Sequence, residues 1–190
     1  MELSKAILSR KSTKRFSGKK VNLKKIIRVL DNIRQNPCAG NMFNLKFIII
    51  QSEETIDKIS IAAQQDFIKH AGAVIAVVSD REKIKKMYDY NDKGFAAQQA
   101  GAAIQTILLN LTEAEIANCW IGFFDDGLMA EALGTKSQTV EAVIALGEPT
   151  KSNEEKNTDK PRPDLENIVF FEKYGNKKLE KETKVRGDWA

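Results

Sequence analysis

The residues best suited to chemistry gather near the N-terminus, in the run Arg10-Lys11-Ser12-Thr13-Lys14. An arginine presents a fork of donors that matches phosphate oxygens, a serine hydroxyl adds a further donor, and a lysine supplies a point charge. The run therefore favours a site for an anionic ligand. A solvated basic loop stays open as the alternative, because positive charge continues along the chain as far as Arg28.

Two weaker signals follow the basic run. Asn36-Pro37-Cys38-Ala39-Gly40-Asn41 combines small residues with a proline turn, so that backbone amides are exposed. Its last side chain, Asn41, can both donate and accept, which suits the edge of a flat heterocycle. Asp159-Lys160-Pro161-Arg162-Pro163 places two cations in a stiff turn and favours a phosphate clamp. Alone, the first of these is an ordinary helix-to-strand loop.

Side chains for other kinds of catalysis are scarce. Cys38 and Cys119 are the only cysteines and His70 is the only histidine, too few for a disulfide framework or a structural zinc site. The chain has neither a Gly-x-Gly-x-x-Gly run after a strand nor a Walker A sequence, which argues against ordinary dinucleotide or P-loop sites. Chemistry carried by a bound cofactor needs none of these side chains.

The composition is that of an ordinary globular protein. The chain has 190 residues, of which 42% are hydrophobic and 29% charged, with a net charge of +4. This excess suits an anionic ligand but is too small to indicate nucleic acid. No apolar run reaches about 18 residues and no signal peptide is recognisable, so we expect a cytoplasmic protein with no membrane partner.

Hydrophobic periodicity gives the elements that must position these residues. We expect helices over residues 2–8, 23–33, 53–64, 92–111 and 128–133. We expect strands over residues 45–50, 73–78, 118–123 and 140–146. Asn22 is a suitable N-cap, Gly134 a suitable helix end, and residues 45–50 are too apolar for an exposed edge strand. The mixture without strict alternation predicts a layered sheet flanked by helices.

The domain organisation is simple. Residues 1–170 are expected to form a single domain, with a polar surface loop over residues 150–160. Residues 171–190 form a charged tail with little core material, which is either disordered or draped on a partner subunit. The alanine-rich helix over residues 92–111 is expected in the core or at a dimer interface.

The order of the three signals resembles the FMN-dependent nitroreductase family. The matching features are the basic run followed by Phe16, then Pro37-x-x-x-Asn41, then a core strand, and finally Lys160-x-Arg162. Asp92-x-Gly94-x-Ala96-Ala97-Gln98 and the run from Cys119 to Asp125 are also similar to that family. The resemblance spans roughly residues 1 to 170 and implies an α+β layered sandwich with a central, mostly antiparallel sheet.

The resemblance also implies roles for individual residues. It assigns to FMN binding the residues Arg10, Lys11, Ser12, Lys14, Cys38, Ala39, Asn41, Gly122, Phe123, Lys160 and Arg162. Arg10, Lys11 and Ser12 would lie at the phosphate and ribityl chain, where Lys160 and Arg162 would return. Lys14 would act as an electrostatic stabiliser at the flavin N1/O2 edge. Cys38, Ala39 and Asn41 would line the ribityl chain and ring, and the backbone of Gly122 and Phe123 would approach N5.

Some positions depart from the family pattern. The run Met42-Phe43-Asn44-Leu45 stands where x-Gln-Pro-Trp is common, and Gly122-Phe123 stands where a Glu-Gly pair is common. Phe43 cannot make the hydrogen bonds of a glutamine. These changes affect the substrate pocket and the N5 side more than the phosphate site. Phe43, Phe123 and Phe124 either shape an acceptor pocket or pack in the core.

The implied activity is an NAD(P)H-dependent reduction. The resemblance implies a cytoplasmic homodimer with FMN at the subunit interface, which passes hydride from NAD(P)H through FMN to a nitroaromatic or quinone. Two alternative functions stay open. The altered positions favour a non-enzymatic flavin carrier or redox sensor. The basic stretch up to Arg28 would suit a nucleic-acid-binding domain, but no aromatic stacking platform accompanies it.

Overall fold

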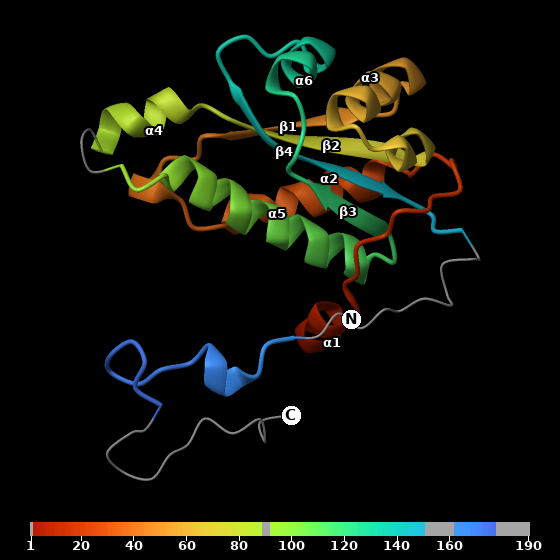
Figure 1. The fold of residues 1–190 in the computed structure, drawn as a ribbon. Helices are drawn as coiled ribbons and strands as arrows, with labels where there is room; N and C mark the ends of the chain where they lie inside the picture. The colour runs from red at the N-terminus through yellow and green to blue at the C-terminus, as the bar shows by residue number, and fades with distance from the viewer. Residues whose placement is uncertain (1, 89–91, 151–161, 178–190) are drawn as a thin grey trace. The chain divides into compact units, whose positions relative to one another are not determined.

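The computed structural model describes residues 2–88, 92–150 and 162–177 of the chain. The chain divides into two compact units, Met1–Asn153 and Glu154–Ala190. The first unit carries the sheet and all the long helices of the described residues (Figure 1).

Four strands form one sheet in the first unit. They are β1 (Leu45–Ile50), β2 (Ala73–Ser79), β3 (Ala117–Ile121) and β4 (Thr139–Gly147). Their order is β1-β2-β4-β3, and each neighbouring pair is antiparallel. The register shifts between Val77 and Val78, where β2 meets β4. This agrees with the predicted α+β fold with a mostly antiparallel central sheet.

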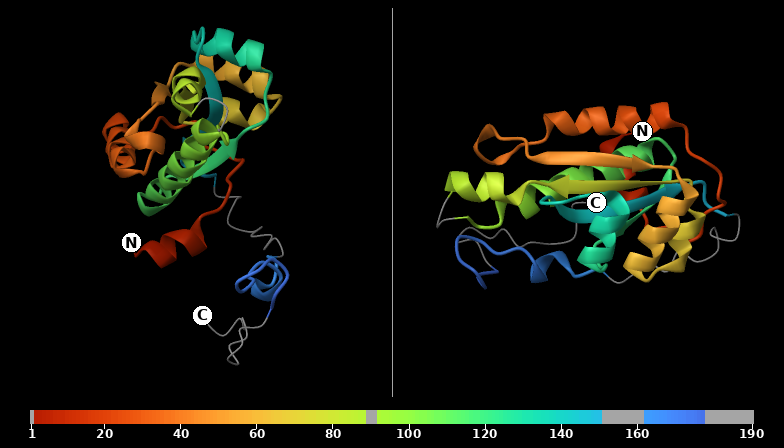
Figure 2. Two further views of the ribbon diagram at one scale, coloured as in Figure 1. Left: turned by 90° about the vertical axis from the view of Figure 1, so that its left-hand side faces the viewer. Right: turned by 90° about the horizontal axis from the view of Figure 1, so that it is seen from above.

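Helices cover both faces of the sheet, and Figure 2 shows these layers from two further sides. The helices are α1 (Leu3–Ser9), α2 (Leu23–Asn32), α3 (Glu53–Ala63), α4 (Arg81–Tyr88), α5 (Phe95–Glu113) and α6 (Asp126–Leu133). Short 3-10 turns are η1 (Ile33–Gln35), η2 (Ala39–Asn41), η3 (Asp66–His70) and η6 (Leu165–Asn167). Residues of α2 and α5 form the core on one face, and residues of α3, η3 and α6 form the core on the other.

Local signals account for most of the helix ends. The Asn22 side chain accepts a hydrogen bond from the Lys24 N–H at 2.9 Å, as its predicted role as N-cap requires. Gly134 ends α6 in the left-handed region. The long helix begins at Phe95 rather than at the predicted Asp92, because Gly94 has a φ of +75°. The Asp92 carboxylate accepts hydrogen bonds from the backbone N–H groups of Gly94 and Phe95 at the start of this helix.

One expectation about the sheet is wrong. Residues 45–50 were expected away from an exposed edge, yet β1 is an outer strand of the sheet that the described residues form. Its apolar side chains are accommodated because both faces of the sheet are covered: Leu45 belongs to one core and Ile50 to the other. An apolar strand therefore indicates that both faces of the sheet are covered, but it does not indicate whether the strand has a neighbour on each side. The helix α4 was not predicted, since Ile84 is its only buried residue.

The second unit contributes few described residues. Residues 162–177 contain η6 and a turn in which the rings of Phe170 and Tyr174 lie 4.9 Å apart. The predicted surface loop lies almost wholly outside the described residues, as does most of the predicted tail. Their organisation, including a single domain over residues 1–170, stays a prediction. Within the described part of the chain, no helix is long and apolar enough to cross a membrane.

Candidate functional site

The basic segment Arg10–Lys14 is fixed by its backbone against the start of β3. The Arg10 N–H donates to the Ala6 carbonyl at 3.0 Å, and so closes α1. Two residues on, Ser12 forms a parallel bridge with Asn118, and the Thr13 N–H donates to the Asn118 carbonyl at 2.9 Å. Thr13 is buried, whereas Lys11, Ser12 and Lys14 are exposed. The fold therefore holds the backbone and leaves the polar side chains outward.

The chain after Lys14 is anchored at the same end of the sheet. Phe16, which is 4% exposed, belongs to the core and forms a bridge with Pro149 beyond the end of β4. The Ser17 N–H donates to the Glu148 carbonyl at 2.9 Å, and the Gly18 N–H donates to the His70 carbonyl at 3.1 Å. The contact with Gly18 uses the backbone of His70, whose side chain is exposed.

The cations of this segment act on nearby groups. The Lys14 Nζ lies 5.6 Å from the centroid of the Phe67 ring, within the range of a cation–π contact. Burial raises the pKa of the Cys119 thiol, while the positive charges of Lys14 and Arg10 act in the opposite direction. The start of β3 is therefore a region of positive potential, which suits a phosphate.

The strand β3 leads from the basic segment to Gly122 and Phe123. Asn118 lies near its start and Ile121 is its last residue, so the two predicted contacts follow at the opposite end. Gly122 is exposed and the Phe123 side chain is 74% exposed. A strand of this length spans roughly 15 Å. By contrast, Phe124 packs against the core, which resolves its role in favour of packing.

The loop with Cys38, Ala39 and Asn41 forms η2, just before β1. Cys38 and Ala39 are half-buried and Asn41 is exposed. Gly40 and Asn41 have φ values of +57° and +55°, so both adopt the left-handed region. An asparagine tolerates this region better than most residues, which gives Asn41 a local structural reason besides its predicted contact with the ring.

Within one protomer these two groups of residues lie apart. The basic segment meets β3 at the end where β2 begins and β4 finishes, whereas η2 precedes β1 at the opposite end of the strands. β1 and β3 are also the two outer strands of the sheet. The separation is roughly 15 Å across the sheet and roughly 20 Å along it. The two groups therefore do not come together at one site within a single protomer.

The structure describes only one of the two cations of the predicted phosphate clamp, Lys160 and Arg162. Arg162 is exposed in the second unit, and Lys160 lies outside the described residues. Their predicted return to the phosphate stays a prediction.

Three buried polar residues, Asn44, Gln99 and Asn118, have side-chain atoms without a hydrogen-bond partner among the described residues, and none of them was predicted as a site residue. Both side-chain polar atoms of Gln99 and the Oδ1 of Asn118 lack a hydrogen-bond partner, although the residues are only 7% and 2% exposed. Gln99 lies two helical turns before Thr106, on the same face of α5, and Thr106 bonds to Asn36 beside η1. A glutamine on the alanine-rich, buried face of a helix was the sequence signal that could have indicated Gln99. Buried unsatisfied groups of this kind fit a site that a polar ligand completes.

These residues fit a phosphate-bearing heterocycle such as FMN. Arg10, Lys11, Ser12 and Lys14 offer cations and a hydroxyl at one end of β3. Asn41 offers an exposed amide before β1, and Gln99 has a buried, unsatisfied amide on α5. Charge for the phosphate and paired donors and acceptors for a ring edge are both available.

Comparison with known proteins gives the family of this chain. The nitroreductase family model matches residues 7–65 and 60–148. The chain belongs to the nitroreductase family. The match covers the basic segment, η2 and all four strands, and leaves residues 149–190 outside.

Individual relatives also support the family. The chain is 29% identical over 154 residues to "Putative NADH dehydrogenase/NAD(P)H nitroreductase" of Archaeoglobus fulgidus, covering 78% of this chain and 86% of the relative. A nitroreductase family protein of Clostridium difficile 630 superposes with a TM-score of 0.79 at 25% identity, covering 91% and 99% of the two chains. An FMN-dependent nitroreductase of Clostridium difficile R20291 gives 0.73 at 21% identity, covering 89% and 98%. The family makes this chain an oxidoreductase.

Proposed function

We propose that this nitroreductase-family protein binds FMN and uses NAD(P)H to reduce an electron-poor acceptor such as a nitroaromatic or a quinone. The observation that carries the proposal is the anchored basic segment. Its backbone N–H groups donate to the carbonyls of Ala6 and Asn118, so the side chains of Lys11, Ser12 and Lys14 are available to a ligand. The printed names of an FMN-dependent solved relative and an NAD(P)H nitroreductase relative support the cofactor and the donor.

The chain's own residues have binding and electrostatic roles in this proposal. When bound, FMN supplies the hydride chemistry, which explains why the chain needs no side chain as general acid or base. Arg10, Lys11 and Ser12 hold the phosphate with charge-assisted hydrogen bonds. Lys14 keeps a positive charge close to β3, where it favours negative charge that develops during reduction.

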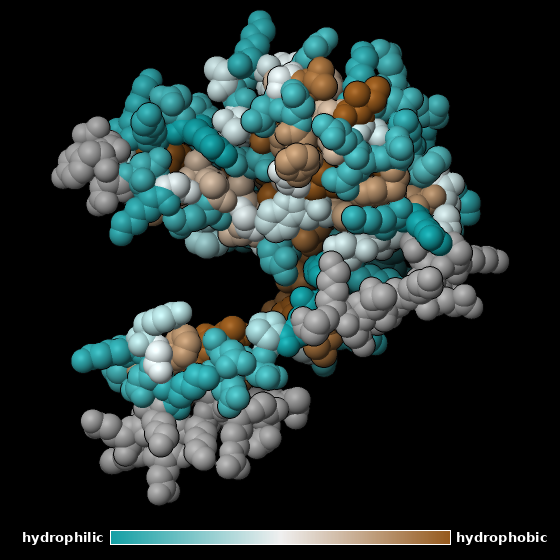
Figure 3. All heavy atoms as spheres, viewed as in Figure 1, coloured by the Kyte–Doolittle hydropathy of each residue, from teal (hydrophilic) through white to brown (hydrophobic). Residues whose placement is uncertain are grey.

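A homodimer completes the proposed site. η2 and the basic segment lie at opposite ends and opposite edges of one sheet, so a second copy has to supply one of them. The helix α1 offers a surface for such a contact, because Leu3, Ile7 and Leu8 are 66%, 53% and 86% exposed. Figure 3 shows hydrophobic surface where α1 lies. Exposed apolar side chains grouped on one short helix are typical of an interface.

The direct test is an absorbance spectrum of the purified protein. We expect a flavin spectrum that bleaches when NADH or NADPH is added without oxygen. A colourless protein that does not take up added FMN would contradict the proposal. A yellow protein that NAD(P)H does not bleach would instead support a flavin carrier or redox sensor, the alternative that Phe43 and the 74% exposed Phe123 keep open.

The phosphate assignment has its own test. Arg10→Ala is expected to weaken FMN binding by about tenfold, because a charge-assisted hydrogen bond contributes about 1.4 kcal/mol or more. Arg162→Ala examines the second clamp in the same assay. Arg34→Ala is the matched control, since Arg34 pairs with Asp31 on the surface of η1. Equal FMN affinity of all three variants and the parent would refute the assignment.

A further inference from the structure

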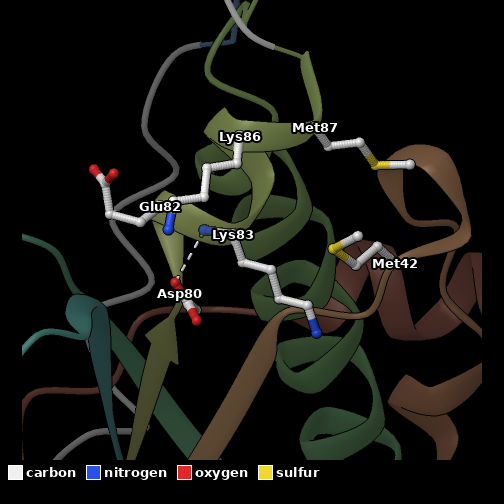
Figure 4. A pocket seen from close by; sticks show the side chains of 6 residues that line it. All are labelled: Met42, Asp80, Glu82, Lys83, Lys86 and Met87. Atoms are coloured by element: carbon white, nitrogen blue, oxygen red, sulfur yellow. Dashed lines mark hydrogen bonds between the residues drawn. The ribbon is translucent and has the colours of Figure 1, made fainter.

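A cavity of about 500 Å³ lies between α4 and the segment that joins η2 to β1. Figure 4 shows the side chains that line it: Met42, Asp80, Glu82, Lys83, Lys86 and Met87. The volume is within the range of small-molecule sites, but the cavity is an open depression that leaves one side of a ligand in solvent. None of these six residues belongs to the set assigned to FMN.

The cavity adjoins the loop proposed to contact the flavin. Met42 directly follows Asn41, the last residue of η2. Met87 packs on the same loop, since a Cβ on Gly40 would lie 2.5 Å from its Cε. The two thioether side chains thus form a wall that the cavity shares with η2. A ligand in the cavity would lie next to the place where the acceptor is expected.

The charges around the cavity are unevenly satisfied. Arg81 is paired with Glu141, and an Asp80 oxygen accepts from the Lys83 N–H at 3.1 Å at the start of α4. The Glu82 carboxylate points away from the two methionines (Figure 4). Lys83 extends between Asp80 and Met42 (Figure 4), and neither Lys83 nor Lys86 takes part in the ion pairs found among the described residues. The lining thus carries two ammonium groups outside these ion pairs: the Lys83 ammonium extends toward Met42, and the Lys86 ammonium points toward Glu82 (Figure 4).

We infer that this cavity binds an acceptor that is both aromatic and anionic, such as a nitroarene with a carboxylate. The Lys83 ammonium pairs with the carboxylate, and Lys86 adds to the positive potential. The polarizable sulfurs of Met42 and Met87 contact the ring, as thioethers do at aromatic edges. The inference rests on the proposed function and refines it, because it makes α4 a determinant of acceptor specificity.

Binding can be measured without turnover. The protein is labelled at the methionine methyl carbons and titrated with 4-nitrobenzoate in the absence of NAD(P)H. We expect chemical-shift changes at Met42 and Met87, assigned by Met42→Leu and Met87→Leu. Met129, which is 0% exposed in the core between α3 and α6, is the internal control and should not change. The methyl ester of 4-nitrobenzoate, which lacks the charge, should bind about fivefold more weakly.

Two substitutions test the charge. The double variant Lys83→Gln with Lys86→Gln should bind 4-nitrobenzoate about fivefold more weakly than the parent and leave binding of the ester unchanged. Lys85→Gln is the matched control, because Lys85 is exposed on the same helix and does not line the cavity. Equal affinity for acid and ester would overturn the inference, as would an equal effect of Lys85→Gln or shift changes that reach Met129.

Failure of the inference is distinguishable from failure of the proposed function. A yellow protein that NAD(P)H bleaches and that reduces the ester and the acid equally well keeps the function and removes the inference. A colourless protein that takes up no FMN, yet shows nitrobenzoate-induced shifts at Met42 and Met87, keeps the cavity assignment and removes the function.

Discussion

The two ends of the sheet are held together in different ways. At the end with the basic segment, backbone groups make the connections: Thr13 to Asn118, Ser17 to Glu148 and Gly18 to His70. At the end with η2, side chains make many of the connections. Met87 packs on Gly40, the Asn44 amide donates to the Asp80 carbonyl at 3.3 Å, and Arg81 pairs with Glu141.

At the end with the basic segment, the groups that stabilise the fold are not the groups proposed to contact a ligand. At the end with η2, the same side chains do both. Backbone hydrogen bonds do not depend on which side chain a residue carries, so the basic segment can present cations without a cost to the fold. At the η2 end, the side chains that position the loop are neighbours of the cavity. We expect substitutions there to change both stability and acceptor binding.

The largest effect is expected from Gly72→Ala at the basic end. A Cβ on Gly72 would overlap the backbone oxygen of Lys19, which cannot move without disturbing the Val21–Gly72 hydrogen bond. The free energy of unfolding should fall by about 3 kcal/mol, as in severe overpacking. Chemical denaturation measures it. Gly101→Ala on α5 is the control, since nothing lies within 4 Å of its Cβ, and should leave stability unchanged or slightly raised. A small loss for Gly72→Ala would contradict a backbone-held end.

The next effect, at the η2 end, comes from Gly40→Ala. The left-handed φ of +57° costs an alanine about 1 kcal/mol, and displacing Met87 adds about 1 kcal/mol. Gly94→Ala isolates the first contribution, because Gly94 has a φ of +75° and open space around its Cβ. Thermal denaturation should show the larger fall in Tm for Gly40→Ala. Equal falls would mean that Met87 does not hold the loop.

A smaller effect is expected from Glu141→Gln. Arg81 donates to Glu141 at 2.8 and 2.7 Å, and Ser79 also donates to it. Burial raises the pKa of Glu141, but these hydrogen bonds and the Arg81 charge lower it further, so the pKa lies below the ordinary value of 4.5. The loss should be about 1 kcal/mol, because Arg81 is 53% exposed and water screens the pair.

The pH dependence of that loss has a definite sign. A carboxyl whose pKa is lowered by folding stabilises the fold above its unfolded pKa and loses that contribution as the pH falls through its folded pKa. The difference in stability between the parent and Glu141→Gln should therefore be full at pH 7 and shrink below about pH 4.5. A difference that grows on acidification would contradict the assigned shift.

The smallest effect on stability is expected from Lys11→Ala and Ser12→Ala. Both side chains are exposed, and the bridge between Ser12 and Asn118 uses the backbone. Stability should change by less than about 0.5 kcal/mol, while FMN affinity falls. Parallel denaturation and FMN titration would show this separation. A loss of stability comparable to that of Gly40→Ala would erase the contrast between the two ends.

The sequence was sufficient for the elements with strong periodicity. The strand Leu45–Ile50, the N-cap Asn22 and the left-handed end at Gly134 were predicted because each depends on adjacent residues. The edge position of β1, the helix α4 and the unsatisfied Gln99 were not predicted, because each is decided by distant parts of the chain. The basic segment and η2 were both found, but periodicity gave no indication that one protomer places them at opposite ends of its sheet.

The bridge between Ser12 and Asn118 has a consequence for solubility. Among the described residues β3 pairs with one strand only, β4, and the basic segment occupies the start of its other edge. Open edges invite pairing with other chains, and charged residues placed along them discourage it. Removing residues 1–14 would expose an edge that carries the 43% exposed Trp120. We therefore expect the cations proposed to bind phosphate also to discourage edge-to-edge aggregation.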